Sequence, residues 1–401
     1  MQLGWIDFSK TEQSKILSVL ELLGQGTLDE LGVAPVRDGF ANLFFPGTST
    51  IQTRAKYFLL IPYIFRDLER SGEYHLQSIR KALSALERDC ASKMWLQNRS
   101  EFGLIGSSSL QNGGWVKRPP SDIYWAGLKK YGIFLYADFT MEEYLKSVCA
   151  LNQKKSAVHK LGNRKDQAEE NSCDDADAGG LSSARFWNIP TYEPNWKEHI
   201  SMQLTKAEAE FLRGQMIKTC SNSFLGFILE SQRTDLLQYD SFRALGDCRQ
   251  TFPEQIQKDY SMAQAFSEFL FCIRIVYNRL VSNYQNEAAN IEFGNRHKGF
   301  PKTADIDLAE IFTRLQIQDK YLRRFLEAAQ KDMLENQMKK LEDHIRDREI
   351  FLKGESRAKT AHPGELDPRT WVGGGYLDYR FSTARRLLLD IFEGANKNAE
   401  P

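Results

Sequence analysis

The polar residues best placed for chemistry lie in one N-terminal stretch, FFPGTSTIQTRAKYF, from Phe44 to Phe58. Ser49 followed three residues later by Gln52 matches a capping box, which predicts a helix over about residues 50–70. Arg54 and Lys56 would then fall in its first turns, where the helix dipole disfavours positive charge. Cations at that position indicate an anionic partner, either a phosphate or an acidic side chain.

Two explanations of this stretch are open. In the first, the helix N-terminus binds a phosphate. The residues that would contact it are Arg37, Ser49, Thr50, Arg54 and Lys56. The stretch lacks the glycine spacing of a nucleotide P-loop, which excludes that motif. In the second, the helix is structural and Arg54 pairs with Asp38 or Glu30.

A second group of cations flanks a short predicted helix over residues 121–131. It consists of Lys117, Arg118, Lys129 and Lys130. The preceding residues 103–118 are rich in glycine and serine, with a short strand predicted around Leu104 and Ile105. This order resembles a winged helix with a wing hairpin, in which residues 121–131 or 50–61 would contact DNA. The alternative places Tyr124, Trp125 and Leu128 in a core.

A third group, of three arginines and one tyrosine, follows a glycine-rich loop near the C-terminus. The group consists of Tyr379, Arg380, Arg385 and Arg386. These residues would suit an anion site or a surface where a partner protein docks. The alternative is a structural helix, starting at Ser382 or Thr383, that buries its apolar side chains while its arginines pair with acids. Those side chains are Leu387, Leu388, Leu389 and Ile391.

No catalytic motif is recognisable. The six histidines show no metal-ligand spacing, and neither GxSxG nor SxxK motifs are present. The acidic cluster Asp174, Asp175 and Asp177 lies in a segment without a predicted scaffold, so it predicts no site. We therefore assign no catalytic residue, no metal and no cofactor from the sequence.

Composition describes a chain with a sizeable core. Of 401 residues, 42% are hydrophobic, and the formal net charge is zero, so the whole chain has no long-range attraction to nucleic acid. The six cysteines are scattered without a CxxC pair, which is typical of reduced intracellular thiols. The N-terminus lacks a signal-peptide pattern, and no apolar run is long enough to cross a membrane. We expect a cytoplasmic protein that does not contact a membrane.

The elements that would position these residues are mainly helical. We predict a helical, winged-helix-like domain over residues 1–151, a mobile linker or loop over 152–184, and a larger helical domain over 185–401. The linker is predicted because this segment is rich in charged residues and contains almost no large apolar ones. Helices are also predicted over about 35–45 and 73–96, and from Thr140 to about Leu151.

Two predicted helices have especially clear patterns. Ser9 and Glu12 form a capping box before apolar residues at helical spacing, namely Ile16, Val19, Leu20 and Leu23. The widest apolar face belongs to residues 258–288, which predicts a central helix. Thr205 with Glu208 predicts the start of another helix, and residues 319–352 predict one long or two shorter charged helices.

Four sequence blocks together resemble one bacterial family of unknown function. They are LGWIDFS (3–9), DELGVAPVRDGFANLFFPGTSTIQTRAKYF (29–58), PSDIYWAGLKKYGIF (120–134) and WVGGGYLDYRFSTARRLLLDIF (371–392). The family has no assigned activity. The resemblance implies a genomic context of phage-defence islands, beside helicase and phospholipase-D-like nuclease genes.

The leading hypothesis is a non-catalytic accessory subunit of a bacterial phage-defence or DNA-processing system. It would bind DNA, or a helicase or nuclease partner, through residues around Arg37, Arg54, Lys56, Lys117 and Arg118. One alternative is an enzyme acting on nucleic acid or a phosphorylated substrate, with Arg37, Arg54, Tyr57 and Asp38 at its site. Another is a helical scaffold that oligomerises through residues 258–288 and 319–352, and the sequence leaves the oligomeric state open.

Overall fold

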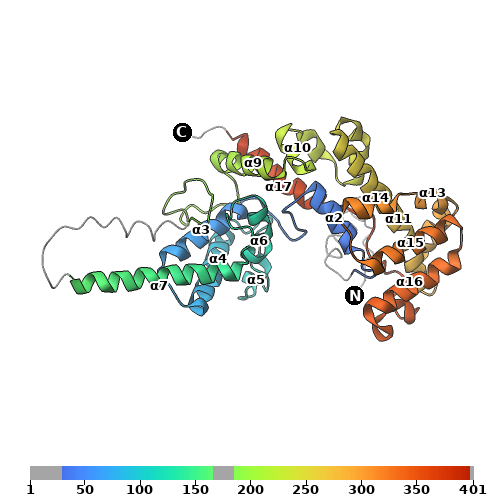
Figure 1. Ribbon diagram of the computed structural model, residues 1–401, viewed down its shortest axis with the longest axis horizontal. Helices are drawn as coiled ribbons and strands as arrows, with labels where there is room; N and C mark the ends of the chain where they lie inside the picture. Colours follow the sequence, from blue (N-terminus) through green and yellow to red (C-terminus); the bar gives the residue numbers. More distant parts are fainter. Residues whose placement is uncertain (1–28, 166–184, 398–401) are drawn as a thin grey trace, which may run out of the picture. The chain divides into compact units, whose positions relative to one another are not determined.

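The computed structural model describes residues 29–165 and 185–397, and these residues are mainly helical (Figure 1). No strand forms among them, although an isolated antiparallel bridge pairs Phe134 with Trp187. The prediction of a mainly α fold is therefore confirmed. The helix predicted after Ser9 lies outside the described residues.

The chain divides into two compact units. Unit 1 combines Met1–Phe44 with Asp240–Tyr379, and unit 2 combines Phe45–Tyr239 with Arg380–Pro401. The sequence instead predicted a division at residues 152–184. The observed division differs because each unit is completed by a segment that is remote in sequence, which local composition does not reveal.

Helix α7 (Met141–Lys165) occupies the first part of the predicted linker. Its start agrees with the sequence, since the Thr140 hydroxyl accepts a hydrogen bond from the Glu143 N–H at 3.2 Å. The helix continues past its predicted end because Asn152 is buried and donates to the Glu73 carbonyl at 2.9 Å. The other part of the predicted linker, residues 166–184, lies outside the described residues.

Unit 1 is built around α11 (Glu254–Val281), the central helix that the apolar spacing predicted. Phe266, Phe269 and Ile273 on this helix are fully buried. Its packing partners include α2 (Ala34–Phe44), α12 (Glu287–Arg296), α13 (Phe300–Ala304), α16 (Met338–Lys353), η2 (Arg243–Thr251) and η5 (Lys359–Ala361).

The other elements of unit 1 refine two predictions. Helix α2 confirms the helix expected from Pro35. The charged segment 319–352 forms two helices, α15 (Lys320–Leu334) and α16, which pack on each other. They are separated at Asn336, whose φ of +56° is incompatible with a continuous helix. The remaining elements are η3 (His297–Gly299), α14 (Leu308–Arg314) and η4 (Glu355–Arg357).

The first part of unit 2 centres on α3 (Tyr57–Arg70), which packs against α4 (Leu76–Gln97) and α6 (Pro120–Lys130). Helix α4 also contacts α5 (Ser107–Gln111) and α7. Helix α3 runs through Pro62 as one element. These helices enclose an aromatic core. It is formed by Phe65, Trp125, Phe134, Tyr144 and Trp187.

The second part of unit 2 contains α9 (Lys206–Cys220), α10 (Phe224–Glu230), η1 (Thr234–Gln238) and α17 (Phe381–Ala395). The capping box predicted from Thr205 and Glu208 is present at the start of α9. Helix α17 packs closely on α9 at Gly394, where a Cβ atom would lie 2.9 Å from the Cβ of Ala209. The absence of a side chain therefore permits this helix contact.

The predicted wing hairpin at residues 103–118 is wrong. This segment forms α5 and turns, because Gly103, Gly106 and Gly113 adopt positive φ values of +80°, +90° and +70°. The predicted strand residues Leu104 and Ile105 are buried in a turn.

The described cysteines are Cys90, Cys149, Cys220, Cys248 and Cys272, and all five are free thiols. Among the described helices, none combines the length and apolar character needed to cross a membrane.

Candidate functional site

The segment before α3 folds differently from its prediction. Helix α3 begins at Tyr57 and not near residue 50. The Gln52 side chain closes a turn, since its amide donates to the Gly47 carbonyl and its oxygen accepts from the Ser49 N–H, both at 3.2 Å. The Tyr124 hydroxyl accepts the next two amides, those of Thr53 and Arg54. These backbone groups are therefore satisfied without a helix.

Arg54 is held by two acidic side chains of unit 2. Its Nε donates to both oxygens of Asp390 at 3.0 Å, and one terminal nitrogen donates to Glu101 at 2.8 Å. Only 14% of the Arg54 side chain is exposed. Burial raises the pKa of Asp390, and the Arg54 guanidinium opposes that rise. Arg54 therefore has the structural ion pair foreseen as the alternative, with partners other than the predicted Asp38 and Glu30.

Lys56 is also neutralised. Its Nζ lies 2.6 and 2.7 Å from the two carboxylate oxygens of Glu208, and the residue is only 7% exposed. The same Glu208 completes the capping box of α9 and accepts from the Tyr63 hydroxyl at 3.3 Å. This buried pair joins the start of α3 to the start of α9.

The other residues predicted around Gly47 have surroundings of their own. Arg37 belongs to unit 1 and pairs with its neighbour Asp38 at 3.2 Å. Thr50 is exposed, and the buried Ser49 hydroxyl has no hydrogen-bond partner among the described residues. The Tyr57 hydroxyl, considered for an enzyme site, accepts the Ile105 N–H at 2.9 Å.

The C-terminal cationic group is also engaged within its own units. In unit 1, the buried Tyr379 hydroxyl donates to the Ala263 carbonyl at 2.6 Å. In unit 2, Arg380 donates to the Thr48 carbonyl at 2.8 Å, and Arg385 donates to the Leu237 carbonyl. Burial lowers the pKa of Arg386. Helix α17 buries Leu387, Leu388 and Ile391, as the structural alternative predicted, but Leu389 is only half-buried.

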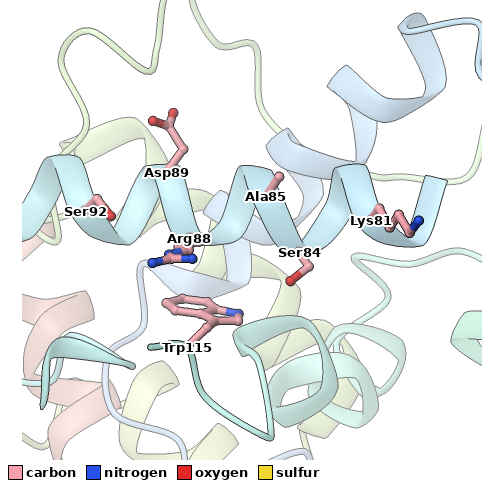
Figure 2. A pocket seen from close by; sticks show the side chains of 7 residues that line it. All are labelled: Lys81, Ser84, Ala85, Arg88, Asp89, Ser92 and Trp115. Carbon is pink, nitrogen blue, oxygen red and sulfur yellow. The ribbon is translucent and has the colours of Figure 1, made fainter. Parts of the chain in front are cut away.

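An open groove lies elsewhere in unit 2, along the outer face of α4 (Figure 2). Its volume is about 520 Å³. The lining residues are Lys81, Ser84, Ala85, Arg88, Asp89, Ser92 and Trp115. Six of them follow helical spacing on α4, so they share one side of the helix. Figure 2 shows the seventh, Trp115, presenting its indole ring to α4 close to Arg88.

The position of Trp115 is fixed by the backbone around it. Gly106 has a φ of +90°, and a Cβ there would lie 2.7 Å from the indole ring, so the ring packs directly on this glycine. Arg88 donates to the Gly113 carbonyl at 2.9 Å, which ties the loop before Trp115 to α4. The indole N–H is buried and has no acceptor among the described residues.

The charges at this groove differ from those around Arg54. Lys81, Arg88, Lys117 and Arg118 are exposed, and none forms a salt bridge within the described residues. The groove carboxylate, Asp89, is paired with Lys93 at 2.9 Å. Lys117 and Arg118 lie just beyond Trp115 along the chain, after Val116. The groove and the loop beside it therefore carry an excess of available positive charge.

Sequence reasoning identified Lys117 and Arg118 but missed Trp115, Lys81 and Arg88. The missed signal is the set of polar and cationic residues at helical spacing over residues 81–92, together with a tryptophan after two glycines. Lys129 and Lys130, in contrast, end α6, where cations complement the helix dipole.

A model of a family of unknown function, DUF6361, matches residues 1–145, a range that includes the whole groove. No curated protein matches the chain. No solved structure matches it. Within the described ranges, no group of three or more His, Cys, Asp or Glu residues is arranged to hold a metal ion.

Proposed function

We propose that this protein is a non-catalytic accessory subunit that binds DNA through the groove of α4 and Trp115. The observation that carries the proposal is the contrast between two sets of cations. Arg54 and Lys56 are neutralised by buried carboxylates, whereas Lys81 and Arg88 line an open groove without an acidic partner. Cations without an acidic partner can neutralise phosphates and release counterions.

The dimensions of the groove support a nucleic-acid ligand. Lys81 and Arg88 are seven residues apart on α4, which corresponds to about 10 Å along the helix axis. This distance is on the order of a few phosphate spacings along one DNA strand. The hydroxyls of Ser84 and Ser92 lie on the same face and suit phosphate oxygens.

Trp115 favours single-stranded over duplex DNA within this proposal. Aromatic rings beside a cationic groove stack on unpaired bases, whose faces a duplex does not expose. In the cell, the subunit would serve a DNA-processing or phage-defence complex with a helicase or phospholipase-D-like nuclease. This context comes from the sequence resemblance.

The test is a titration of a fluorescent twenty-nucleotide single strand, and of its duplex, with the full chain at several salt concentrations. The double variant Lys81→Glu/Arg88→Glu is expected to bind the single strand at least about tenfold more weakly, with a shallower salt dependence. The matched control is Lys339→Glu/Lys340→Glu on α16, which changes the net charge equally on exposed lysines of unit 1.

Three results would contradict the proposal. The first is an absence of DNA binding by the unaltered chain. The second is equal weakening by both double variants, which would indicate net charge and not the groove. The third concerns proteins that co-purify with the chain from its host after nuclease treatment. In this result the unaltered chain binds no DNA, and substitution of Lys81 and Arg88 abolishes the co-purification. That result would assign the groove to a protein partner.

A further inference from the structure

Unit 1 carries an exposed apolar cluster on α15 and α16, consisting of Tyr321, Phe351 and Leu352. Their exposed fractions are 48%, 61% and 39%. The rings of Tyr321 and Phe351 are in contact, with centroids 5.1 Å apart. Leu352 is linked to these rings through Arg348, which approaches both the Phe351 ring and the Gly32 position that Leu352 contacts. We therefore treat the three exposed side chains as one apolar cluster.

The N-terminal end of the described chain is anchored beside this apolar cluster. A Cβ atom on Gly32 would lie 3.0 Å from a methyl carbon of Leu352, so the backbone there touches the cluster. Arg348 donates to the Leu31 carbonyl at 2.9 Å, and its guanidinium lies 6.0 Å from the centre of the Phe351 ring. Glu30 is bound by Lys353 of α16. Residues 30–32 are therefore fixed at the edge of the cluster.

The sequence immediately before this anchor has an apolar face of its own. Ile16, Val19, Leu20 and Leu23 repeat at helical spacing after the capping box at Ser9. From Leu23 to Asp29 the chain can span at most about 20 Å, which keeps this face within reach of Leu352. A tethered apolar segment also has a high effective concentration at a neighbouring surface.

We propose that residues 9–23 dock on the apolar cluster of the same chain as an amphipathic helix. Ile16, Val19, Leu20 and Leu23 would cover Tyr321, Phe351 and Leu352. The docked segment would complete unit 1 and prevent association through the exposed cluster. This inference is independent of the proposed DNA binding.

Hydrogen exchange of the full chain, followed by mass spectrometry of peptides over residues 9–24, tests this docking. We expect these amides to exchange at least about tenfold more slowly than in an unstructured peptide. Phe351→Asp should remove that protection. The matched control Ile291→Asp alters another exposed apolar residue of unit 1, 55% exposed on α12, and should leave it intact.

Exchange in α11 reports whether each variant still folds. If Phe351→Asp also loses protection there, Leu20→Asp is the deciding variant, because it alters only the proposed ligand. It should release the segment and increase binding of an apolar dye to the cluster. Unprotected amides over 9–24 in the unaltered chain would overturn the proposal, as would protection that survives both Phe351→Asp and Leu20→Asp. Protection that disappears on dilution would also overturn it, by assigning the cluster to a second copy of the chain.

Discussion

The Arg54 guanidinium and the Asp390 carboxylate form a buried ion pair although 336 residues separate them in the sequence. Asp390 also accepts the Ala55 N–H at 2.7 Å, so one carboxylate fixes both the backbone and the side chain of the segment before α3. The pair thereby connects α17 to the beginning of unit 2. Its role is architectural, because carboxylates neutralise the cation that precedes this helix start.

Replacing Asp390 by Asn should destabilise unit 2 by about 2 kcal/mol, because it weakens charged hydrogen bonds to the largely buried Arg54. Among the described residues, Glu101 would then be the acidic partner that remains. Urea denaturation followed by tryptophan fluorescence measures the effect. The matched control is Glu142→Gln, which removes an exposed carboxylate of unit 2 paired with Arg80 and should leave the midpoint unchanged. Equal midpoints for both variants would mean that the Arg54–Asp390 pair contributes nothing.

Glu87 should make stability depend on pH. Burial raises the pKa of Glu87 to about 7, although its carboxylate accepts the Ser121 N–H at 2.8 Å. The folded state therefore holds a proton that the unfolded state releases above its ordinary pKa of 4.5. Stability contributed by this proton is present at low pH and is lost as the pH rises towards about 7.

Glu87→Gln should remove this dependence, since an amide resembles the protonated carboxyl. The variant should be more stable than the unaltered chain at pH 8, and the difference should shrink as the pH falls to 5. Urea midpoints at several pH values measure that difference. A gap that stays constant between pH 5 and pH 8 would show that Glu87 does not titrate in this range.

Gly47→Ala should destabilise unit 2 through two effects. Gly47 has a φ of +81°, and an added Cβ would lie 2.8 Å from the Tyr131 ring. Gly72 is the matched control, because its φ of +71° imposes similar backbone strain but leaves open space around a Cβ. Backbone strain alone costs about 1 kcal/mol, so Gly72→Ala should lose that amount and Gly47→Ala clearly more. Equal losses, measured in urea, would exclude a steric role for Tyr131.

Trp115→Ala should weaken binding of single-stranded DNA about tenfold, the effect expected for loss of one stacked base. Trp115→Phe keeps an aromatic face and should retain most of the affinity. Fluorescence anisotropy with the same labelled strand measures both. If the Ala and Phe variants bind equally well, stacking on Trp115 does not contribute, and only the cations of the groove would remain as contacts.

The sequence predicted features that depend on local patterns. The central helix α11, the capping box of Thr205 and Glu208, and the C-terminal helix with its buried leucines all arise from residues within a few turns of one another. The predicted wing failed because glycines that suit a hairpin also suit consecutive tight turns. Residue types alone do not distinguish the two.

The partners of Arg54 and Lys56 could not be predicted from spacing. Asp390 and Glu208 are remote in the sequence, and only packing brings them to the start of α3. The groove was missed for a related reason. Trp115 faces α4 because Gly106 allows the ring to lie on its backbone, which is a three-dimensional contact without a sequence motif.

The way the two units share the chain has a consequence for synthesis on the ribosome. Residues 45–239 emerge long before α17, which packs on α9 and supplies Asp390 to Arg54. Unit 2 therefore lacks its C-terminal segment while residues 240–379 of unit 1 are translated. Neither half of a nascent chain cut at the middle contains a whole unit. Folding of both units must finish late, and the growing polypeptide is a natural client for chaperones that shield unfinished cores.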